Sequence, residues 1–167
     1  MKKYFILLLL LSIISIAQEK NKLIVDEKSG KLMLVGLCDR TAFADTSFSW
    51  WFNSEYDNYS VDSVSLKILG NKLIGYTITI ILGSWCGDSR REVPRFLKIL
   101  DAAAYDQKSL TLICVDRQKT TPTGETNNLD IKFVPTFIVY KDSVEIGRII
   151  ETPKETLEKD LMKIIVK

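Results

Sequence analysis

The residues best suited to chemistry lie around Cys86, in the sequence Trp85-Cys86-Gly87-Asp88-Ser89. An apolar, β-branched run precedes this sequence and a run with helical periodicity follows it, so Cys86 is predicted at a strand-to-helix turn. Unpaired amide groups at a helix N-terminus stabilise a thiolate, the form of cysteine that acts as a nucleophile. The spacing therefore predicts a nucleophilic thiol, with Trp85 shielding one side of the sulfur. The alternative is a cysteine that merely lies in a turn.

The polar neighbours of Cys86 act in opposite directions. Arg90 and Arg91 in the first helical turn would add positive potential near the thiolate, whereas Asp88 would reduce it. The Ser89 hydroxyl has two interpretations that the sequence leaves open. It either hydrogen-bonds the Cys86 thiolate or helps to cap the first turn of the helix.

The other two cysteines have different expected roles. Cys114 lies inside the apolar run Leu112-Ile113-Cys114-Val115, where a small buried thiol is the ordinary outcome. Cys38 follows a predicted strand and has polar neighbours, so it is expected to be exposed. One hypothesis is that Cys38 resolves a disulfide formed at Cys86.

Composition excludes several classes of function. The chain has 167 residues, 46% of them hydrophobic, which suits one globular domain. It has no histidine, so Ser-His-Asp and Cys-His catalysis and metal sites with imidazole ligands are excluded. Three cysteines are too few for a four-thiolate metal site. The sequence also has no Gly-x-Gly-x-x-Gly or Walker-type loop, so no metal or other cofactor is expected.

The first seventeen residues have the pattern of a secretory signal peptide. Lys2 and Lys3 precede an apolar run over 4–17, and Ser15 and Ala17 are the small residues that a signal peptidase reads. Cleavage after Ala17 would leave a mature protein of about zero net charge, so no nucleic-acid partner is expected. We therefore expect a periplasmic or secreted protein with no permanent membrane anchor. An uncleaved anchor is the alternative.

Hydrophobic periodicity places the elements of the first half of the chain. Strands are expected over 31–37 and 73–82, and helices over 61–69 and 86–104. Seven aromatic residues lie within 43–59, and several of them have helical spacing. The segment is expected to be a helix whose apolar face packs on the sheet, with an aromatic surface facing the substrate as the alternative.

The second half continues with strands and one helix. Strands are expected over 110–115, 136–140 and 144–150, and the polar segment 117–128 is expected to be a loop. A last helix is expected to begin at Thr152-Pro153, with Glu155 completing a capping box. The order from residue 73 onward is strand, helix, strand, loop, two strands and helix.

Four features of this sequence resemble the thioredoxin family. Residues 85–89 resemble the W-C-G-x-C motif with Ser89 in place of the second cysteine, and Pro94 matches the proline that kinks the active-site helix. Val134-Pro135-Thr136 resembles the cis-proline loop, and Gly147 resembles the glycine that lines the peptide-binding groove. The resemblance implies an α/β, thioredoxin-like three-layer fold over 60–167, with a central mixed β-sheet flanked by helices. Residues 18–59 would be an N-terminal extension.

The resemblance also implies a set of site residues, which are Cys86 and Ser89 for catalysis and Trp85, Val134, Pro135 and Gly147 for substrate binding. Ser89 cannot attack a mixed disulfide as a second cysteine would, so the implied activity is monothiol thiol–disulfide exchange resolved by an external thiol. The stretch 79–82 also lacks the buried acid that thioredoxins carry there. The implied partners are protein thiols or disulfides, or a low-molecular-weight thiol. A non-catalytic peptide- or protein-binding module of the same fold is the alternative.

Overall fold

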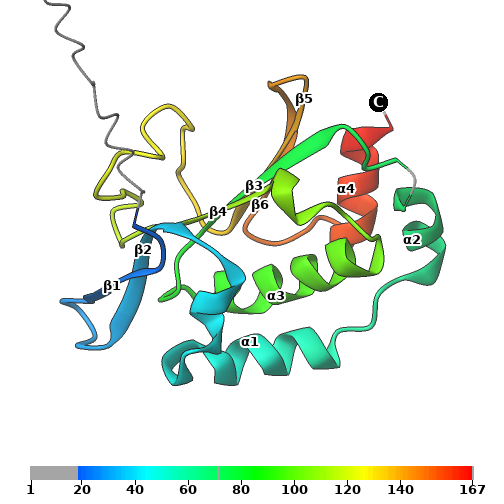
Figure 1. Ribbon diagram of the computed structural model, residues 1–167. Helices are drawn as coiled ribbons and strands as arrows, with labels where there is room; N and C mark the ends of the chain where they lie inside the picture. Colours follow the sequence, from blue (N-terminus) through cyan, green and yellow to red (C-terminus); the bar gives the residue numbers. More distant parts are fainter. Residues whose placement is uncertain (1–18, 71, 167) are drawn as a thin grey trace, which may run out of the picture.

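The computed structural model describes residues 19–70 and 72–166, so the expected signal peptide over 1–17 lies outside the described residues. Six strands form one sheet in the order β1-β2-β4-β3-β5-β6 (Figure 1). Their bounds are Lys22–Val25 for β1, Leu32–Cys38 for β2, Tyr76–Leu82 for β3, Leu110–Cys114 for β4, Thr136–Lys141 for β5 and Val144–Ile150 for β6. At the centre, β3 is parallel to β4 and antiparallel to β5, which makes the sheet mixed.

Four α-helices accompany the sheet: α1 (Thr46–Asn58), α2 (Ser63–Leu69), α3 (Gly87–Ala102) and α4 (Leu157–Ile165). Two short 3₁₀ turns lie at Arg40–Ala44 and Gln107–Ser109. Within the described residues, no helix combines the length and the apolar character needed to span a membrane. A mixed sheet with flanking helices confirms the expected thioredoxin-like α/β fold class.

The two faces of the sheet are covered differently. Ile78, Ile80 and Leu82 of β3 point into a large cluster that also contains residues of all four helices, and we call this cluster the helix-side core. Ile81 points the other way, into a smaller cluster that we call the loop-side core; its other buried members are Ile113, Val115, Val134 and Ile138. This alternation follows from the two-residue period of a strand. The helices therefore gather over one face.

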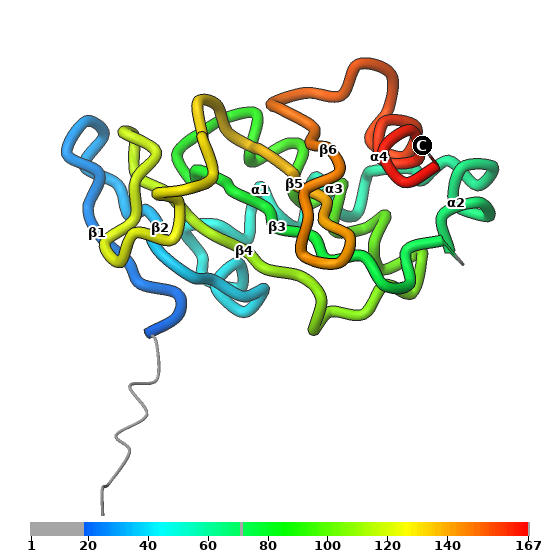
Figure 2. Tube along the Cα trace, turned by 90° about the horizontal axis from the view of Figure 1, so that it is seen from above, coloured from blue at the N-terminus to red at the C-terminus, as the bar shows by residue number. Residues whose placement is uncertain are grey.

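On the opposite face the segment 116–133 takes the place of a helical layer. Both views place this yellow segment beside β2 (Figures 1 and 2), and Leu129 and Ile131 pack against the loop-side core. The segment contains turns but no helix, as its polar composition with Pro122 and Gly124 predicts. The expected three layers thus consist of helices, sheet and an irregular loop.

The stretch 18–59, expected as an extension, is built into the same fold. It supplies β1 and β2, which join the sheet through β4, and α1, which packs on α3. The aromatic face of α1 was predicted to pack on the sheet, but the helix packs mainly on α3. Phe48 and Trp51 are buried in the helix-side core, but the hydroxyl of Tyr56 donates to Asp101 of α3 at 2.7 Å. The helix lies on α3, which itself covers the sheet.

The last helix begins later than expected. Its N-cap is Thr156, whose side chain accepts a hydrogen bond from the amide of Lys159. The carboxylate of Asp160 accepts bonds from the amides of Lys154 and Glu155, and so holds the preceding segment in a turn. The expected start at Thr152-Pro153 is therefore wrong. The amides of Lys154 and Glu155, which would have lain in the first turn, are bonded to the Asp160 side chain instead.

Candidate active site

Cys86 lies where β3 ends and α3 begins. It is the N-cap residue of α3, with extended backbone angles (φ −88°, ψ 131°), and the amide of Arg90 donates to its carbonyl at 3.0 Å. The thiol is half-buried, whereas Cys38 and Cys114 are buried. The first amides of a helix have no partner within it and carry partial positive charge, and Cys86 is the residue that caps this end of α3. The predicted strand-to-helix placement of Cys86 is confirmed.

The segment Val134-Pro135 meets Cys86 although it lies far away in the sequence. The Cys86 thiol donates a hydrogen bond to the carbonyl oxygen of Val134 at 3.3 Å, and the Val134–Pro135 peptide bond is cis. The Val134 side chain is only 3% exposed and Pro135 is buried. Both side chains contribute to packing, and the Pro135 carbonyl accepts from the Glu151 amide. Any backbone contact with a ligand here therefore falls to Val134.

Trp85 packs against the ends of the central strands β3 and β4. Its indole N–H donates to the carbonyl of Val115 at 2.9 Å, and its ring covers Gly83 so closely that an added Cβ there would lie 2.7 Å from the ring. Glycine at position 83 is therefore needed for the ring to occupy this place. Trp85 is half-buried and, like Cys86, packs against the loop-side core.

Ser89 has a different bond from either of those expected. Its side chain is fully buried, and its hydroxyl oxygen accepts a hydrogen bond from the amide of Gly83 at 3.1 Å. In the described part of the chain no hydrogen bond joins Ser89 to Cys86. Ser89 therefore fixes the end of β3 to the first turn of α3, and so positions the turn that carries Cys86.

Gly147 does not lie in the groove where the resemblance placed it. An ideal Cβ at Gly147 would meet two carbon atoms of Ile164 at 3.0 Å, so this position faces α4. The residues beside Pro135 are Ile150, the last residue of β6, and Glu151, which follows it. Ile150 pairs with Thr136, and the Glu151 amide donates to the Pro135 carbonyl at 2.7 Å. Sequence reasoning identified the strand but not which residue of it lies next to the cis-proline.

We expect Gly147→Ala to lower stability rather than to block a groove. Overpacking against Ile164 should reduce the free energy of unfolding by about 1–3 kcal/mol, measured by urea denaturation. Gly87→Ala is the matched control, since a Cβ at Gly87 meets open space. An equally stable Gly147→Ala protein that reacted more slowly with peptide disulfides would restore Gly147 to the groove.

A hollow of about 240 Å³ borders the cis-proline segment and is lined by Asp130, Lys132, Phe133, Thr136, Arg148 and Ile150. Phe133 is 51% exposed and Ile150 is 46% exposed, and the two large apolar side chains line this one hollow together. Because Phe133 immediately precedes Val134, this apolar wall lies beside the backbone that Cys86 contacts. Neither Phe133 nor Ile150 was singled out from the sequence, because exposure of an apolar residue has no local signature.

The expectation that Cys38 is exposed is wrong. Cys38 is 6% exposed and points into the helix-side core, whereas Cys86 packs against the loop-side core. Burial, together with the neighbouring Cys38 thiol, raises the pKa of the Cys114 thiol. Cys114 is buried as expected. Cys38 and Cys114 are therefore neighbours in the helix-side core, and Cys38 is not in position to resolve a disulfide at Cys86.

Arg117 and Asp26 form an ion pair next to Trp85, and this pair was not predicted from the sequence. The Arg117 guanidinium lies 5.0 Å from the centre of the Trp85 ring and donates two hydrogen bonds to the Asp26 carboxylate, at 2.8 and 2.7 Å. These bonds hold the pKa of Asp26 well below its usual range. Asp26 follows β1, so the pair ties the first hairpin to Trp85. No local pattern connects residues 91 positions apart.

The Asp26–Arg117 pair should make stability depend on acid. Because the pKa of Asp26 is lowered in the folded state, its contribution is fully present above the unfolded value of about 3.9 and is lost as the pH falls below it. We expect Asp26→Asn to lower the free energy of unfolding at pH 7, with the difference from wild type shrinking toward pH 2. Urea denaturation at several pH values measures this. Asp130→Asn, whose side chain is 77% exposed, is the control; a pH-independent difference would contradict the prediction.

The two arginines expected near the thiolate differ in their partners. Arg91 bonds to Asp88 at 2.7 Å and to Glu92 at 2.6 Å, so its charge is compensated. Arg90 donates from Nε to the carbonyl of Ser84 at 2.7 Å and has no carboxylate partner in the described chain. Of the two expected cations, only Arg90 brings uncompensated charge to the turn around Cys86.

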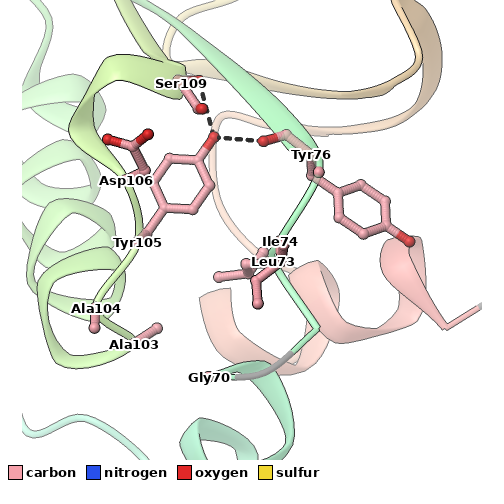
Figure 3. A pocket seen from close by; sticks show the side chains of 10 residues that line it. Gly70, Leu73, Ile74, Tyr76, Ala103, Ala104, Tyr105, Asp106 and Ser109 are labelled. Atoms are coloured by element: carbon pink, nitrogen blue, oxygen red, sulfur yellow. Dashed lines mark hydrogen bonds between the residues drawn. The ribbon is translucent and has the colours of Figure 1, made fainter.

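A further hollow of about 210 Å³ lies at the other end of α3, between the start of β3 and the loop after α3 (Figure 3). The Tyr105 hydroxyl there lies 3.0 Å from the Tyr76 carbonyl and 2.8 Å from the Ser109 carbonyl, and burial raises the pKa of Tyr105 to about 12. This hollow is remote from Cys86 and has no cysteine among its lining residues. Among the residues that the structure describes, no cluster of three histidine, cysteine or acidic side chains could bind a metal ion.

Comparison with known proteins agrees with this geometry at the level of the fold. No family model matches the chain. Thioredoxin AMT13 from Alternaria alternata is 26% identical over 106 residues, which make up 61% of this chain and 85% of that protein.

Two solved structures are similar over most of the chain. A protein of unknown function from Pseudomonas aeruginosa matches with a TM-score of 0.55 and 13% identity, covering 77% of this chain and 89% of that one. An HIV epitope scaffold matches with a TM-score of 0.51 and 13% identity, covering 77% and 82%. Identities this low show the fold alone. The sequence match to a thioredoxin and the topology together support a place in the thioredoxin-like superfamily.

Proposed function

We propose that this thioredoxin-fold protein is an exported monothiol thiol–disulfide exchange protein whose nucleophile is Cys86. The observation that carries the proposal is the position of the Cys86 thiol, which is half-buried at the N-terminus of α3 and 3.3 Å from the Val134 carbonyl at the cis peptide bond. This position supports the proposal, because thiol–disulfide exchange with an extended peptide requires a thiol beside a backbone edge that can pair with the peptide.

The reaction would proceed in two exchanges. The Cys86 thiolate attacks one sulfur of a substrate disulfide, forms a mixed disulfide and releases the other substrate sulfur as a thiolate, which takes up a proton. An external thiolate then attacks the mixed disulfide, regenerates Cys86 and leaves bonded to the first substrate sulfur. Electrons balance because one disulfide is broken and one is formed in each exchange. Ser89 has no part in sulfur transfer and acts by holding the turn.

The substrate would lie along the cis-proline segment. Backbone groups of Val134 would pair with an extended peptide, and Phe133 and Ile150 would contact its apolar side chains. Trp85, held by its bond to Val115, would close the other side of the sulfur. The partners we propose are therefore proteins with accessible disulfides or thiols, with a low-molecular-weight thiol as the external reductant.

The proposal is tested with the reduced protein and a peptide whose cysteine carries a 2-thiopyridyl disulfide. Attack by a thiolate releases 2-thiopyridone, whose absorbance gives the rate, and peptide mapping locates the adduct. We expect the adduct at Cys86 alone, its release by added glutathione, and none on Cys86→Ser. A peptide that binds equally well to wild type and Cys86→Ser without forming an adduct would overturn exchange in favour of the binding module.

Export is proposed from the N-terminal pattern and has its own test. Expression of the full chain with its natural N-terminus, followed by cell fractionation and N-terminal sequencing, should give a product that begins at Gln18 outside the cytoplasm. A product that retains residues 1–17 and stays with the membrane would instead support the uncleaved anchor.

A further inference from the structure

A hollow of about 300 Å³ lies beside the start of α3 and is lined by Lys31, Leu32, Ser47, Trp50 and Arg90. We call it the Trp50 hollow. Its lining comes from the start of β2, the first turns of α1 and the first turn of α3, so four of the five residues belong to the stretch that the thioredoxin resemblance does not cover. None of the five carries a carboxylate.

Arg90 connects the Trp50 hollow to the nucleophile. Its amide donates to the carbonyl of Cys86 at 3.0 Å, and its Nε donates to the carbonyl of Ser84 at 2.7 Å. Its guanidinium carbon lies 5.8 Å from the centre of the Trp50 ring. The guanidinium is therefore fixed on the turn that carries Cys86, and in the described part of the chain its two Nη groups donate to no protein acceptor.

The charge at the Trp50 hollow is unusual for this protein. Every other arginine pairs with a carboxylate in the described structure: Arg40 with Asp101, Arg91 with Asp88 and Glu92, Arg95 with Glu55, Arg117 with Asp26 and Arg148 with Glu145. Arg90 and Lys31 have no ion pair within the described residues. A fixed guanidinium and a nearby ammonium attract a carboxylate, and the guanidinium can bind it through two parallel hydrogen bonds.

Trp50 gives the hollow an apolar surface. Its side chain is 63% exposed, whereas the adjacent Trp51 is 3% exposed in the core. Exposed tryptophan and arginine side chains are the residue types that dominate binding at protein interfaces. The combination of an exposed indole with two uncompensated cations fits a polypeptide with an acidic side chain better than an apolar or basic partner.

We propose that the Trp50 hollow binds an acidic side chain of the polypeptide whose disulfide reacts at Cys86, and so selects substrates with a carboxylate close to the reactive cysteine. This inference rests on the proposed exchange at Cys86. It gives the segment 31–50 a function, which is to build, with Arg90, a second contact surface for the substrate in addition to the cis-proline segment.

The test compares three peptides of one sequence, each with a 2-thiopyridyl disulfide on its single cysteine and with two Glu, two Gln or two Lys beside it. Attack by Cys86 forms the Cys86–peptide disulfide, breaks the peptide–thiopyridyl bond and releases 2-thiopyridone. At low salt the Glu peptide should react about tenfold faster than the Gln peptide, and the Lys peptide more slowly than both. High salt should reduce the preference.

Two substitutions locate the preference. Arg90→Gln and Lys31→Gln should each reduce the Glu/Gln rate ratio, and together they should bring it close to one. Glutamine at position 90 can still donate to the Ser84 carbonyl, and the Lys31 side chain is exposed, so both proteins should fold. Lys67→Gln on α2 is the matched control, because it removes the same charge far from the hollow and should leave the ratio unchanged.

The outcomes separate this inference from the proposed function. Equal rates for the three peptides, each with an adduct at Cys86, would overturn the acidic-substrate inference and leave exchange intact. No adduct with any peptide would overturn exchange itself. Two small disulfides are compared in the same way: oxidised glutathione, which carries carboxylates, and bis(2-hydroxyethyl) disulfide, which is neutral. An Arg90-dependent preference confined to glutathione would overturn the polypeptide substrate in favour of a small anionic thiol.

Discussion

Ser89→Cys should shorten the lifetime of the mixed disulfide at Cys86 by about two orders of magnitude or more. A thiol at position 89 lies in the first turn of α3, three residues after Cys86, and would attack the mixed disulfide from within the protein. An intramolecular thiol has a far higher effective concentration than an external one. The products would be a released peptide thiol and a disulfide between Cys86 and the introduced sulfur.

The measurement uses the isolated adduct of each protein, without added thiol, and follows peptide release by mass spectrometry. Ser89→Ala is the control, since it removes the hydroxyl that accepts from the Gly83 amide without adding a thiol. We expect Ser89→Ala to keep the long-lived adduct and to lose about 1 kcal/mol of stability. If Ser89→Cys also kept the adduct, residue 89 would not be placed to resolve disulfides, and the analogy with dithiol thioredoxins would fail.

Phe137→Ala should cost about 3–5 kcal/mol of stability, a large share of the total for a small domain. Phe137 is fully buried, and its ring lies 4.4 Å from that of Phe96, which is also fully buried. Phe96 belongs to α3, the helix that begins after Cys86, and Phe137 to β5, which follows Pro135. Their contact therefore fixes the nucleophile relative to the cis-proline segment.

Phe133→Ala is the matched control on the other side of Pro135. Because Phe133 is 51% exposed, its removal should change the free energy of unfolding by less than about 0.5 kcal/mol. It should nevertheless slow adduct formation with an apolar peptide, because it removes one wall of the hollow beside Val134. Urea denaturation and 2-thiopyridone release measure the two effects. Equal losses of stability in the two variants would contradict the assignment of one phenylalanine to the core and the other to the groove.

Local patterns in the chain were sufficient to predict most elements and the position of the candidate nucleophile, Cys86. The central strands and the helices other than α4 were predicted close to their observed bounds, because apolar runs and 3.6-residue periodicity depend on local side-chain spacing. The placement of Cys86 at the start of α3 followed from the same local signal. β1 was not predicted, although three of its four residues, Leu23, Ile24 and Val25, are apolar.

The way in which distant segments meet became visible only in the folded chain. The side of the sheet that Gly147 faces, the burial of Cys38 and the pairing of Asp26 with Arg117 each depend on contacts across the sheet, which local periodicity does not encode. The same holds for the single arginine without a carboxylate partner in the described residues, because pairing is a property of the folded surface. Local patterns identified the candidate nucleophile, and long-range packing determined what surrounds it.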